Sequence, residues 1–246
     1  MQQKNFKEYI SIEAMDRKKI KLILLLFILF LAFFLRFWNL GEIDLRGDPE
    51  ARYMALPVME ALDDPSISSF STVGLPGGKK PPGYYWLIAM SFFIFGKNEF
   101  AVRFPSAFFG FLSVVAVFFF SKKYINESVA YLSAFLLATL LFHVSYSRMA
   151  YIEPALAFYS LITLYLLLEM KHKKSYIYLS SLFIALILLT KFFEGILPLL
   201  CLIPFIFITY ICDKENRKSC ISWTLRLAGA FLLGFSIFLI WSIYLS

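Results

Sequence analysis

The chain has 246 residues, of which 60% are hydrophobic and 19% are aromatic, and its formal net charge is +7. This composition excludes a soluble domain, because 29 phenylalanines spread along the chain exceed what one core of this size holds. It also argues against a nucleic-acid-binding protein, because the basic residues stand in short clusters between apolar runs.

The N-terminal segment is polar as far as Lys21 and becomes apolar over residues 22–35. No small-residue cleavage site follows; the sequence Arg-Phe-Trp comes next, at 36–38. This pattern predicts an uncleaved anchor helix with an interfacial tryptophan rather than a removed signal peptide.

Apolar runs recur along the rest of the chain, and runs of about 16 to 20 residues suffice for helices to cross roughly 30 Å of hydrocarbon. Helices are expected because a bilayer offers no water to the backbone, and the alternating pattern of a β-barrel is absent from the sequence. The expected spans are 20–38, 103–121, 129–146, 154–170, 176–190, 194–212 and 225–244. The sequence therefore predicts an all-α polytopic membrane protein, with about seven transmembrane helices in a single module over residues 1–246.

The long loop 39–82 follows the first expected span and contains turn signals at 63–65 and 75–78. Within it, residues 54–62 are expected to form a short helix along the membrane surface. The next segment, 83–96, is apolar but short for a crossing. We expect it to be an interfacial or re-entrant helix, with its aromatic residues 84–86 at the headgroups.

The positions of the basic clusters test whether the segment 83–96 crosses the membrane. If 83–96 does not cross, four clusters fall on one side of the membrane: Arg17-Lys18-Lys19, Lys122-Lys123, Lys171 to Lys174, and Lys214 to Lys218. The positive-inside rule makes that side the cytoplasm, whereas a crossing would move the last three clusters outside. We therefore expect a multi-pass protein of the plasma (inner) membrane with a cytoplasmic N-terminus.

Most of the remaining charged residues in or beside the spans then fall on the external face. They come from five segments of the chain: Asp48, Glu50, Arg52, Lys79, Lys80, Arg103, Arg148, Glu153 and Lys191. Charges at such depth are costly and usually face a polar cavity or one another. This grouping predicts a functional site at the external face.

Asp48 and Glu50 are the first candidates, because a carboxylate near the membrane can act as a general base or hold a metal ion. The alternative is a helix start, in which Asp48 is the cap, Pro49 stands in the first turn and Glu50 complements the helix dipole. The two interpretations are compatible, since a capped helix can hold the acid in place.

Lys79 and Lys80 precede a stiff diproline, a combination suited to binding a phosphate group. Their alternative is contact with anionic lipid, or a solvated turn. Glu153 stands just before Pro154, which can open a helix, and an ion pair with Arg148 in a plain tight loop is the alternative to a site role. Lys191 is alternatively a lysine whose ammonium group extends to the interface.

Five motifs follow one another in the chain: Asp-Pro-Glu-Ala-Arg-Tyr at 48–53, Lys-Pro-Pro-Gly-Tyr-Tyr-Trp at 80–86, Phe-Gly through Asn-Glu to Arg-Phe-Pro at 95–105, Tyr-Ser-Arg at 146–148 with Glu153, and Leu-Thr-Lys at 189–191. In this order they resemble the membrane glycosyltransferases of the GT-C fold, specifically the protein O-mannosyltransferase and lipid A aminoarabinose transferase superfamily. The resemblance covers about residues 20 to 210.

The resemblance implies an inverting glycosyltransferase. Its donor would be a sugar on a polyprenyl phosphate, and its acceptor a hydroxyl of a glycolipid, polysaccharide or protein at the outer face. Asp48 or Glu50 would deprotonate or orient the acceptor, and Glu153 would position the acceptor or the cations. Lys80, helped by Arg52, Arg148 and Lys191, would stabilise the leaving phosphate. The apolar spans would form a groove for the prenyl chain.

The sequence departs from the family pattern at three positions. Pro49 separates two acids that are usually adjacent, so either Asp48, which we favour, or Glu50 is the expected base. Glu153 replaces the usual aspartate. Lys79 stands where some relatives carry an acid able to bind metal, so the sequence does not favour a divalent metal ion but leaves it open. Relatives also continue beyond the position of Ser246, so we expect the C-terminal part of the family to be absent.

Two other functions are open at this stage. A catalytically weak relative would only bind or scaffold lipid-linked sugars, and the separated acids favour it. A lipid or sugar flippase would place charges near the midplane and show inverted repeats, and the sequence shows no repeat.

Overall fold

The computed structural model describes the backbone of residues 2–42, 49–64, 81–204, 210 and 217–244, and it contains no strand in these ranges. Its elements are α1 (Gln2–Phe37), α2 (Pro49–Asp63), α4 (Gly83–Phe95), α5 (Glu99–Tyr124), α6 (Glu127–Thr139), α7 (Leu141–Arg148), α8 (Glu153–Glu169), α9 (Tyr176–Lys191), the 3-10 helix η2 (Phe192–Cys201) and α11 (Arg217–Tyr244). The prediction of an all-α protein with membrane-spanning helices is confirmed.

Among the described residues, three helical stretches are long and apolar enough to cross a membrane: Arg17–Phe37 in α1, Glu99–Tyr124 and Ile221–Ile243 in α11. Helices α6 and α7 make a fourth span when they are taken together, with a bend of 54° between them. Helices α8 and α9 have 17 and 16 residues. They are therefore about 25 Å long, slightly less than the hydrocarbon thickness.

The sixth expected span differs from a regular α-helix. The described part of this span begins with the 3-10 helix η2. Gly195 and Pro198 stand at inner positions of that helix's sequence, away from its two ends. Glycine is a poor helix former and proline lacks the N–H that an α-helix needs, so this sequence does not favour the expected α-helix. Phe192 opens η2 with a φ of 47°, a conformation that bulky residues rarely adopt.

Helix α4 has 13 residues and is therefore about 20 Å long. This length is too short to cross the hydrocarbon, in agreement with the prediction for 83–96. Helix α2 confirms the predicted helix at 54–62 and extends it in both directions. Helix α2 packs against α4 and α5, and its buried residues form one apolar face: Ala51, Met54, Ala55, Val58 and Ala61.

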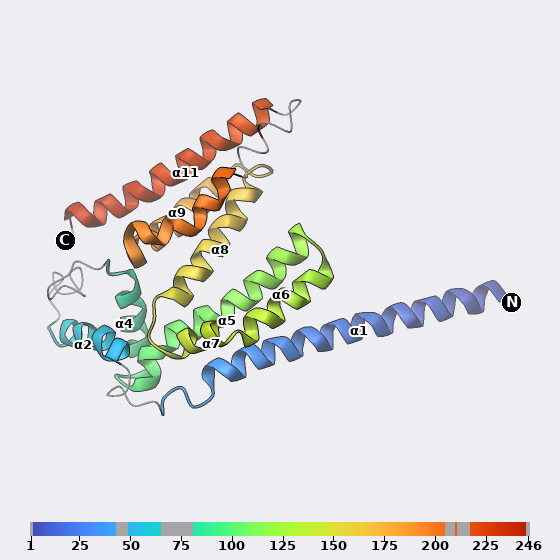
Figure 1. Cartoon of the computed structure of the whole chain (residues 1–246), viewed down its shortest axis with the longest axis horizontal. Coiled ribbons are helices and arrows are strands. Elements are labelled where there is room, and N and C mark those ends of the chain that lie inside the picture. Colours follow the sequence, from blue (N-terminus) through green and yellow to red (C-terminus); the bar gives the residue numbers. More distant parts are fainter. Residues whose placement is uncertain (1, 43–48, 65–80, 205–209, 211–216, 245–246) are drawn as a thin grey trace.

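The long helices form two groups that meet at α5 and α8 (Figure 1). In one group, α1, α5 and α6 pack together; in the other, α8, α9 and α11 do so. On α6, Ala130, Ala134 and Ala138 are fully buried in a cluster that includes Ile28 and Ala32 of α1. Small residues at this spacing let two helix backbones approach closely without a hydrophobic driving force.

One end of the bundle, which we call the basic end, carries the lysine clusters. Lys21 of α1 pairs with Glu127, the first residue of α6, and Lys123 pairs with Glu169 of α8 at 2.7 Å. The cluster 171–174 begins two residues after Glu169. These contacts bring together the described clusters that the sequence predicts on one side of the membrane (Figure 1).

The opposite end, which we call the loop end, contains α2, α4, the connection between α7 and α8, and the ends of α1 and α9 (Figure 1). Arg148 fastens two of these parts together, because its Nη1 donates to the carbonyl oxygens of Leu35 at 3.0 Å and Trp38 at 2.8 Å. The last carbonyls of a helix have no partner within the helix, and a cation is favourable there. Arg148 therefore closes the C-terminal end of α1.

Gly83→Ala is expected to lower stability, because a Cβ at this position would lie 2.7 Å from the backbone oxygen of Leu189. Such overpacking costs about 1–3 kcal/mol, which corresponds to a loss of about 2–10 °C in melting temperature. Gly229→Ala is the control, because its Cβ would meet only the flexible Cδ1 of Ile177, at 3.3 Å. Thermal unfolding in detergent checks the difference, and equal melting temperatures would contradict the described packing of α4 on α9.

Arg148→Gln is expected to destabilise the loop end by about 1.5–3 kcal/mol, because two charge-assisted hydrogen bonds to α1 are lost. Arg52→Gln, which changes an exposed arginine on α2 in the same way, is expected to leave the melting temperature unchanged. Limited proteolysis after residue 38, compared between the two variants, reports directly whether the end of α1 has been released. Equal cleavage would contradict the role of Arg148 as a clamp.

Candidate active site

The first-loop acids lie only partly within the described residues. Asp48 is outside them, and Glu50 is described by its backbone alone, as the second residue of α2. Pro49 is the first residue of that helix, which agrees with the helix-start interpretation, since proline suits the first turn. Arg52 follows on α2 and its side chain is exposed. The structure thus describes the backbone of this motif from Pro49 onward, and the catalytic roles of its two acids are still predictions.

Lys79 and Lys80 also lie outside the described residues, but the chain directly after them is closely packed. Pro81, Pro82 and Gly83 are buried. Gly83 allows α4 to begin against the backbone of Leu189, two residues before Lys191. The segment 81–83 is therefore anchored beside the end of α9.

A chain of buried hydroxyl groups fixes Tyr84, directly after this segment, to two other elements. Ser106 of α5 donates from Oγ to the carbonyl oxygen of Tyr151 at 2.7 Å. The hydroxyl of Tyr84 is hydrogen-bonded to the same Oγ, and because a serine has one hydrogen to donate, Tyr84 is the donor in that bond. This chain joins the start of α4, helix α5 and the α7–α8 connection.

Glu153 and Lys191 form an ion pair at the loop end, with 3.0 Å between Oε1 and Nζ. Glu153 is the first residue of α8 and Lys191 the last residue of α9, so each charge is favourable to the dipole of its own helix. Their side chains are 38% and 33% exposed. Oε2 of Glu153 is buried and has no hydrogen-bond partner among the described residues.

This pairing corrects one of our interpretations from sequence. The ion pair between Arg148 and Glu153, which was the alternative to a site role, is wrong, because Arg148 binds the carbonyls of α1 and Glu153 binds Lys191. The expectation that Pro154 opens the next helix is confirmed, since it stands in the first turn of α8. Arg103, another member of the predicted external set, is fully buried on α5 and donates to the carbonyl oxygen of Glu99 at 3.3 Å.

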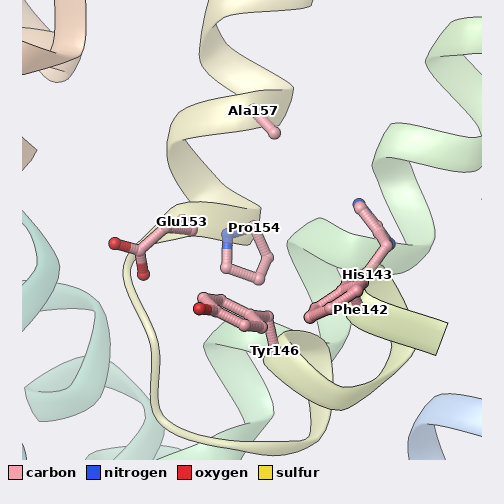
Figure 2. Close-up of a pocket in the computed structure, with 6 residues that line it drawn as sticks. All are labelled: Phe142, His143, Tyr146, Glu153, Pro154 and Ala157. Carbon is pink, nitrogen blue, oxygen red and sulfur yellow. The ribbon is translucent and has the colours of Figure 1, made fainter. Parts of the chain in front are cut away.

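A cavity of about 360 Å³ lies next to Glu153. Its lining is Phe142, His143, Tyr146, Glu153, Pro154 and Ala157, from α7 and the first turns of α8. Figure 2 shows Glu153 on one side of Pro154 and His143 on the other, with the ring of Tyr146 between them. This volume is within the range of roughly 300 to 1,000 Å³ that is usual for small-molecule sites.

Sequence reasoning missed the buried group beside this cavity. Arg36 is fully buried near the end of α1, and its Nη2 lies 2.8 Å from Nδ1 of His143. It also donates to the carbonyl oxygens of Leu137 at 3.0 Å and Ala138 at 3.1 Å. An arginine at the end of an apolar run was the available signal, but its partner is 107 residues away in the sequence.

Metal binding is untested at the first-loop acids. Within the described ranges, no group of three or more His, Cys, Asp or Glu residues is arranged to hold a metal ion. Chemically, the described part offers a paired carboxylate and ammonium group, a free carboxylate oxygen and an aromatic cavity. This arrangement suits a ligand that carries both hydroxyl groups and a negative charge.

Comparisons with known proteins agree with this chemistry. A Bacillus subtilis (strain 168) protein named "Putative mannosyltransferase YkcB" is 28% identical over 170 residues, which cover 69% of this chain and 24% of that protein. Two uncharacterized proteins of Aquifex aeolicus (strain VF5) are 37% identical over 89 residues and 30% identical over 115 residues. The matched residues cover 36% and 46% of this chain, and 21% and 23% of the length of those two proteins, respectively. The chain thus spans about a quarter of the length of these relatives, and no solved structure matches it.

The family comparison covers most of the chain. Residues 79–241 match the family described as dolichyl-phosphate-mannose-protein mannosyltransferase. This range includes the Lys-Pro-Pro motif, Glu153 and Lys191, and it extends through most of α11, beyond the range of the resemblance. It begins after the first-loop acids. The chain therefore belongs to the dolichyl-phosphate-mannose-protein mannosyltransferase family, a family of GT-C type membrane glycosyltransferases.

Proposed function

We propose that this protein acts in sugar transfer from a polyprenyl phosphate, with mannose as the first sugar to test, to an acceptor hydroxyl at the external face of the plasma membrane. The observation that carries the proposal is the Glu153–Lys191 ion pair, which stands beside a cavity at the end of the bundle where residues 81–83, directly after Lys80, are anchored. The family of the chain supports the reaction class.

The leaving group of this reaction is a lipid phosphate, which gains negative charge as the bond to the sugar breaks. Lys191 supplies a cation that is held in place by Glu153, and Lys80 is the covalent neighbour of the buried Pro81. Two ammonium groups near one phosphate stabilise the transition state more than the ground state, because the charge on the phosphate oxygen grows during the reaction. Arg52, exposed on α2, is a further cation for this role; Arg148 acts through the position of α1.

The chemical step follows from these assignments. The oxygen of the acceptor hydroxyl attacks the anomeric carbon as the bond from that carbon to the phosphate oxygen breaks, so the configuration at the carbon inverts. The proton of the hydroxyl goes to a first-loop carboxylate, Asp48 or Glu50, acting as general base. The bonding electrons leave with the polyprenyl phosphate. Glu153 accepts a hydrogen bond from the sugar or the acceptor at its free Oε2.

The lipid chain of the donor requires an apolar path, and α8 offers one. The cavity beside Glu153 includes Pro154 and Ala157, in the first turns of α8. A second, apolar cavity of about 310 Å³ follows along the same helix, between α5 and α8. Its lining is Leu112, Val115, Ala116, Phe119, Phe120, Phe158, Leu161, Ile162 and Tyr165. A prenyl chain in this second cavity would extend along α8 toward the basic end.

A transfer assay tests the function with purified protein and a radiolabelled polyprenyl-phosphate mannose, using membrane extract as the acceptor source. Asp48→Asn or Glu50→Gln, whichever removes the base, is expected to lower transfer by about 100-fold or more. Lys80→Ala and Lys191→Met are expected to lower it by about 10- to 100-fold, because a cation at the phosphate is lost. Lys97→Ala, outside the site on the α4–α5 connection, is the matched lysine control.

Two results would contradict the proposed reaction. Full transfer by both acid variants would show that neither carboxylate is the base. Donor binding without any transfer by the wild-type protein would instead favour a protein that only binds or scaffolds lipid-linked sugars.

The orientation is tested by cysteine labelling in intact cells, with the three native cysteines replaced by serine. Lys97→Cys, at the loop end, is expected to react with a membrane-impermeant maleimide. Lys173→Cys, at the basic end, is expected to react only after the cells are opened, because positive loops remain in the cytoplasm. The reverse labelling pattern would place the proposed site on the cytoplasmic face.

A further inference from the structure

His143 lies in the first turn of α7, directly after the break that separates α6 from α7. The position of this helix is tightly fixed, because a Cβ at Gly110 of α5 would overlap the side chain of Ser147 at 2.1 Å. Ser147 in turn donates to the backbone oxygen of His143 at 2.6 Å. The imidazole therefore occupies a defined place on the wall of the cavity next to Glu153.

Arg36 determines which nitrogen of His143 carries the hydrogen. Its guanidinium group is always protonated and can only donate, so Nδ1 of His143 must accept with its lone pair at 2.8 Å. The neutral imidazole then carries its hydrogen on Nε2. A second proton on the ring is unfavourable, because it would place two positive charges in contact.

Nε2 is buried and has no hydrogen-bond partner among the described residues. A buried N–H without a partner costs about 1–3 kcal/mol, so such groups usually have a partner in the working state of a protein. The Arg36 contact therefore leaves a hydrogen-bond donor, held in one tautomer, on a residue that lines the cavity.

The other lining residues indicate the class of ligand. Phe142, Tyr146, Pro154 and Ala157 provide an apolar and aromatic wall, and Glu153 brings a carboxylate on the other side of Pro154 from His143 (Figure 2). A sugar ring combines apolar C–H faces with hydroxyl groups that both donate and accept. It can pack against Tyr146 and accept a hydrogen bond from His143.

We propose that His143 is a sugar-binding residue, whose Nε2–H donates to a hydroxyl of a pyranose ring in this cavity, and that Arg36 is the positioning residue that fixes its tautomer. The inference rests on the proposed function and extends it by assigning the sugar site. The sugar belongs either to the lipid-linked donor or to a glycan acceptor, and the experiment separates the two.

Arg36 has a second effect on the same site. At the break after Thr139, the carbonyl groups of Leu137 and Ala138 are near the end of α6, where the regular helical partners are lost. Arg36 donates to both oxygens, at 3.0 Å and 3.1 Å, and so allows α7 to turn by 54°. One guanidinium group thus stabilises the bend that presents His143 and orients its ring.

The test measures the dissociation constants of polyprenyl-phosphate mannose and of polyprenyl phosphate without sugar, with the protein in nanodiscs. His143→Asn keeps an acceptor for Arg36 at the position of Nδ1 but has no group at the position of Nε2. It is expected to weaken binding of the sugar-bearing lipid by about 3- to 10-fold, the effect of one hydrogen bond, and to leave binding of the plain lipid unchanged. His143→Gln, which places an amide N–H near the position of Nε2, is expected to restore most of the affinity.

His172→Gln is the matched control, because His172 is the other histidine of the chain and lies beyond α8 at the basic end. It is expected to leave both dissociation constants unchanged. If His143→Asn affects neither lipid but weakens competition by methyl α-mannoside in the transfer assay, the bound sugar is that of the acceptor, which also supports the inference.

Three outcomes would overturn the inference. His143→Asn could behave like the wild type toward all three probes, the two lipids and methyl α-mannoside. It could also weaken the binding of both lipids by the same factor, which would indicate a structural role. If the wild type binds neither lipid, the proposed function fails and the sugar site fails with it. If the wild type transfers sugar and His143→Asn behaves like it toward all three probes, the sugar site alone is overturned.

A spectroscopic measurement isolates the role of Arg36. The imidazole ¹⁵N chemical shifts of His143, recorded in the His172→Gln background, are expected to show the tautomer with hydrogen on Nε2. Arg36→Gln is expected to change the population of tautomers, whereas Lys97→Ala, on the α4–α5 connection, is the control that is expected to keep it. An unchanged spectrum in folded Arg36→Gln would exclude the positioning role.

Discussion

The candidate site depends on one ion pair, between the first residue of α8 and the last residue of α9. Glu153 and Lys191 each stabilise their own helix terminus and at the same time hold two antiparallel helices together at one end of the bundle. Removing either partner would leave the other charge at a partly buried position, which is more costly than losing an exposed pair. The pair therefore serves both the packing of the helices and the charge of the site, and the second carboxylate oxygen of Glu153 is buried without a hydrogen-bond partner among the described residues.

The bilayer imposes a second constraint, because backbone groups within it must find partners in the protein. The chain breaks one of its spans between α6 and α7, and this break is possible where Arg36 donates to the carbonyl groups at the end of α6. Arg148 acts in the same way at the end of α1. Two arginines of the apolar bundle thus satisfy backbone oxygens, and the irregular backbone they permit surrounds the cavity.

The sequence predicted the helical elements well, because each depends on local patterns. The apolar runs predicted α1, α5 and α11, and the limited length of 83–96 predicted the short helix α4. The start of α8 was predictable because proline suits a first turn and Glu153 complements the dipole. The interior Gly195 and Pro198 also gave a local signal against the α-helix expected at 194–212, but the apolar run outweighed it in our interpretation.

The pairing of charges was predictable only in part. The sequence grouped Glu153, Lys191 and Arg148 at one membrane face, but their partners depend on the packing of α1, α8 and α9, which no local pattern encodes. The Arg36–His143 contact was missed for the same reason, since it joins residues from the first span and from a break in the third. The acids of the first loop and the two lysines before Pro81 lie outside the described residues, so their roles are still predictions.

The most direct test of this account is an experimental structure of the protein with a polyprenyl-phosphate sugar bound. The account predicts that the phosphate lies at the loop end beside Lys191, with the sugar in the cavity lined by His143 and Glu153 and the prenyl chain along α8. The basic end also carries lysines and a cavity of about 430 Å³, lined in part by Glu169, Lys171 and His172. A phosphate bound there, or at the midplane of the bundle, would contradict the account.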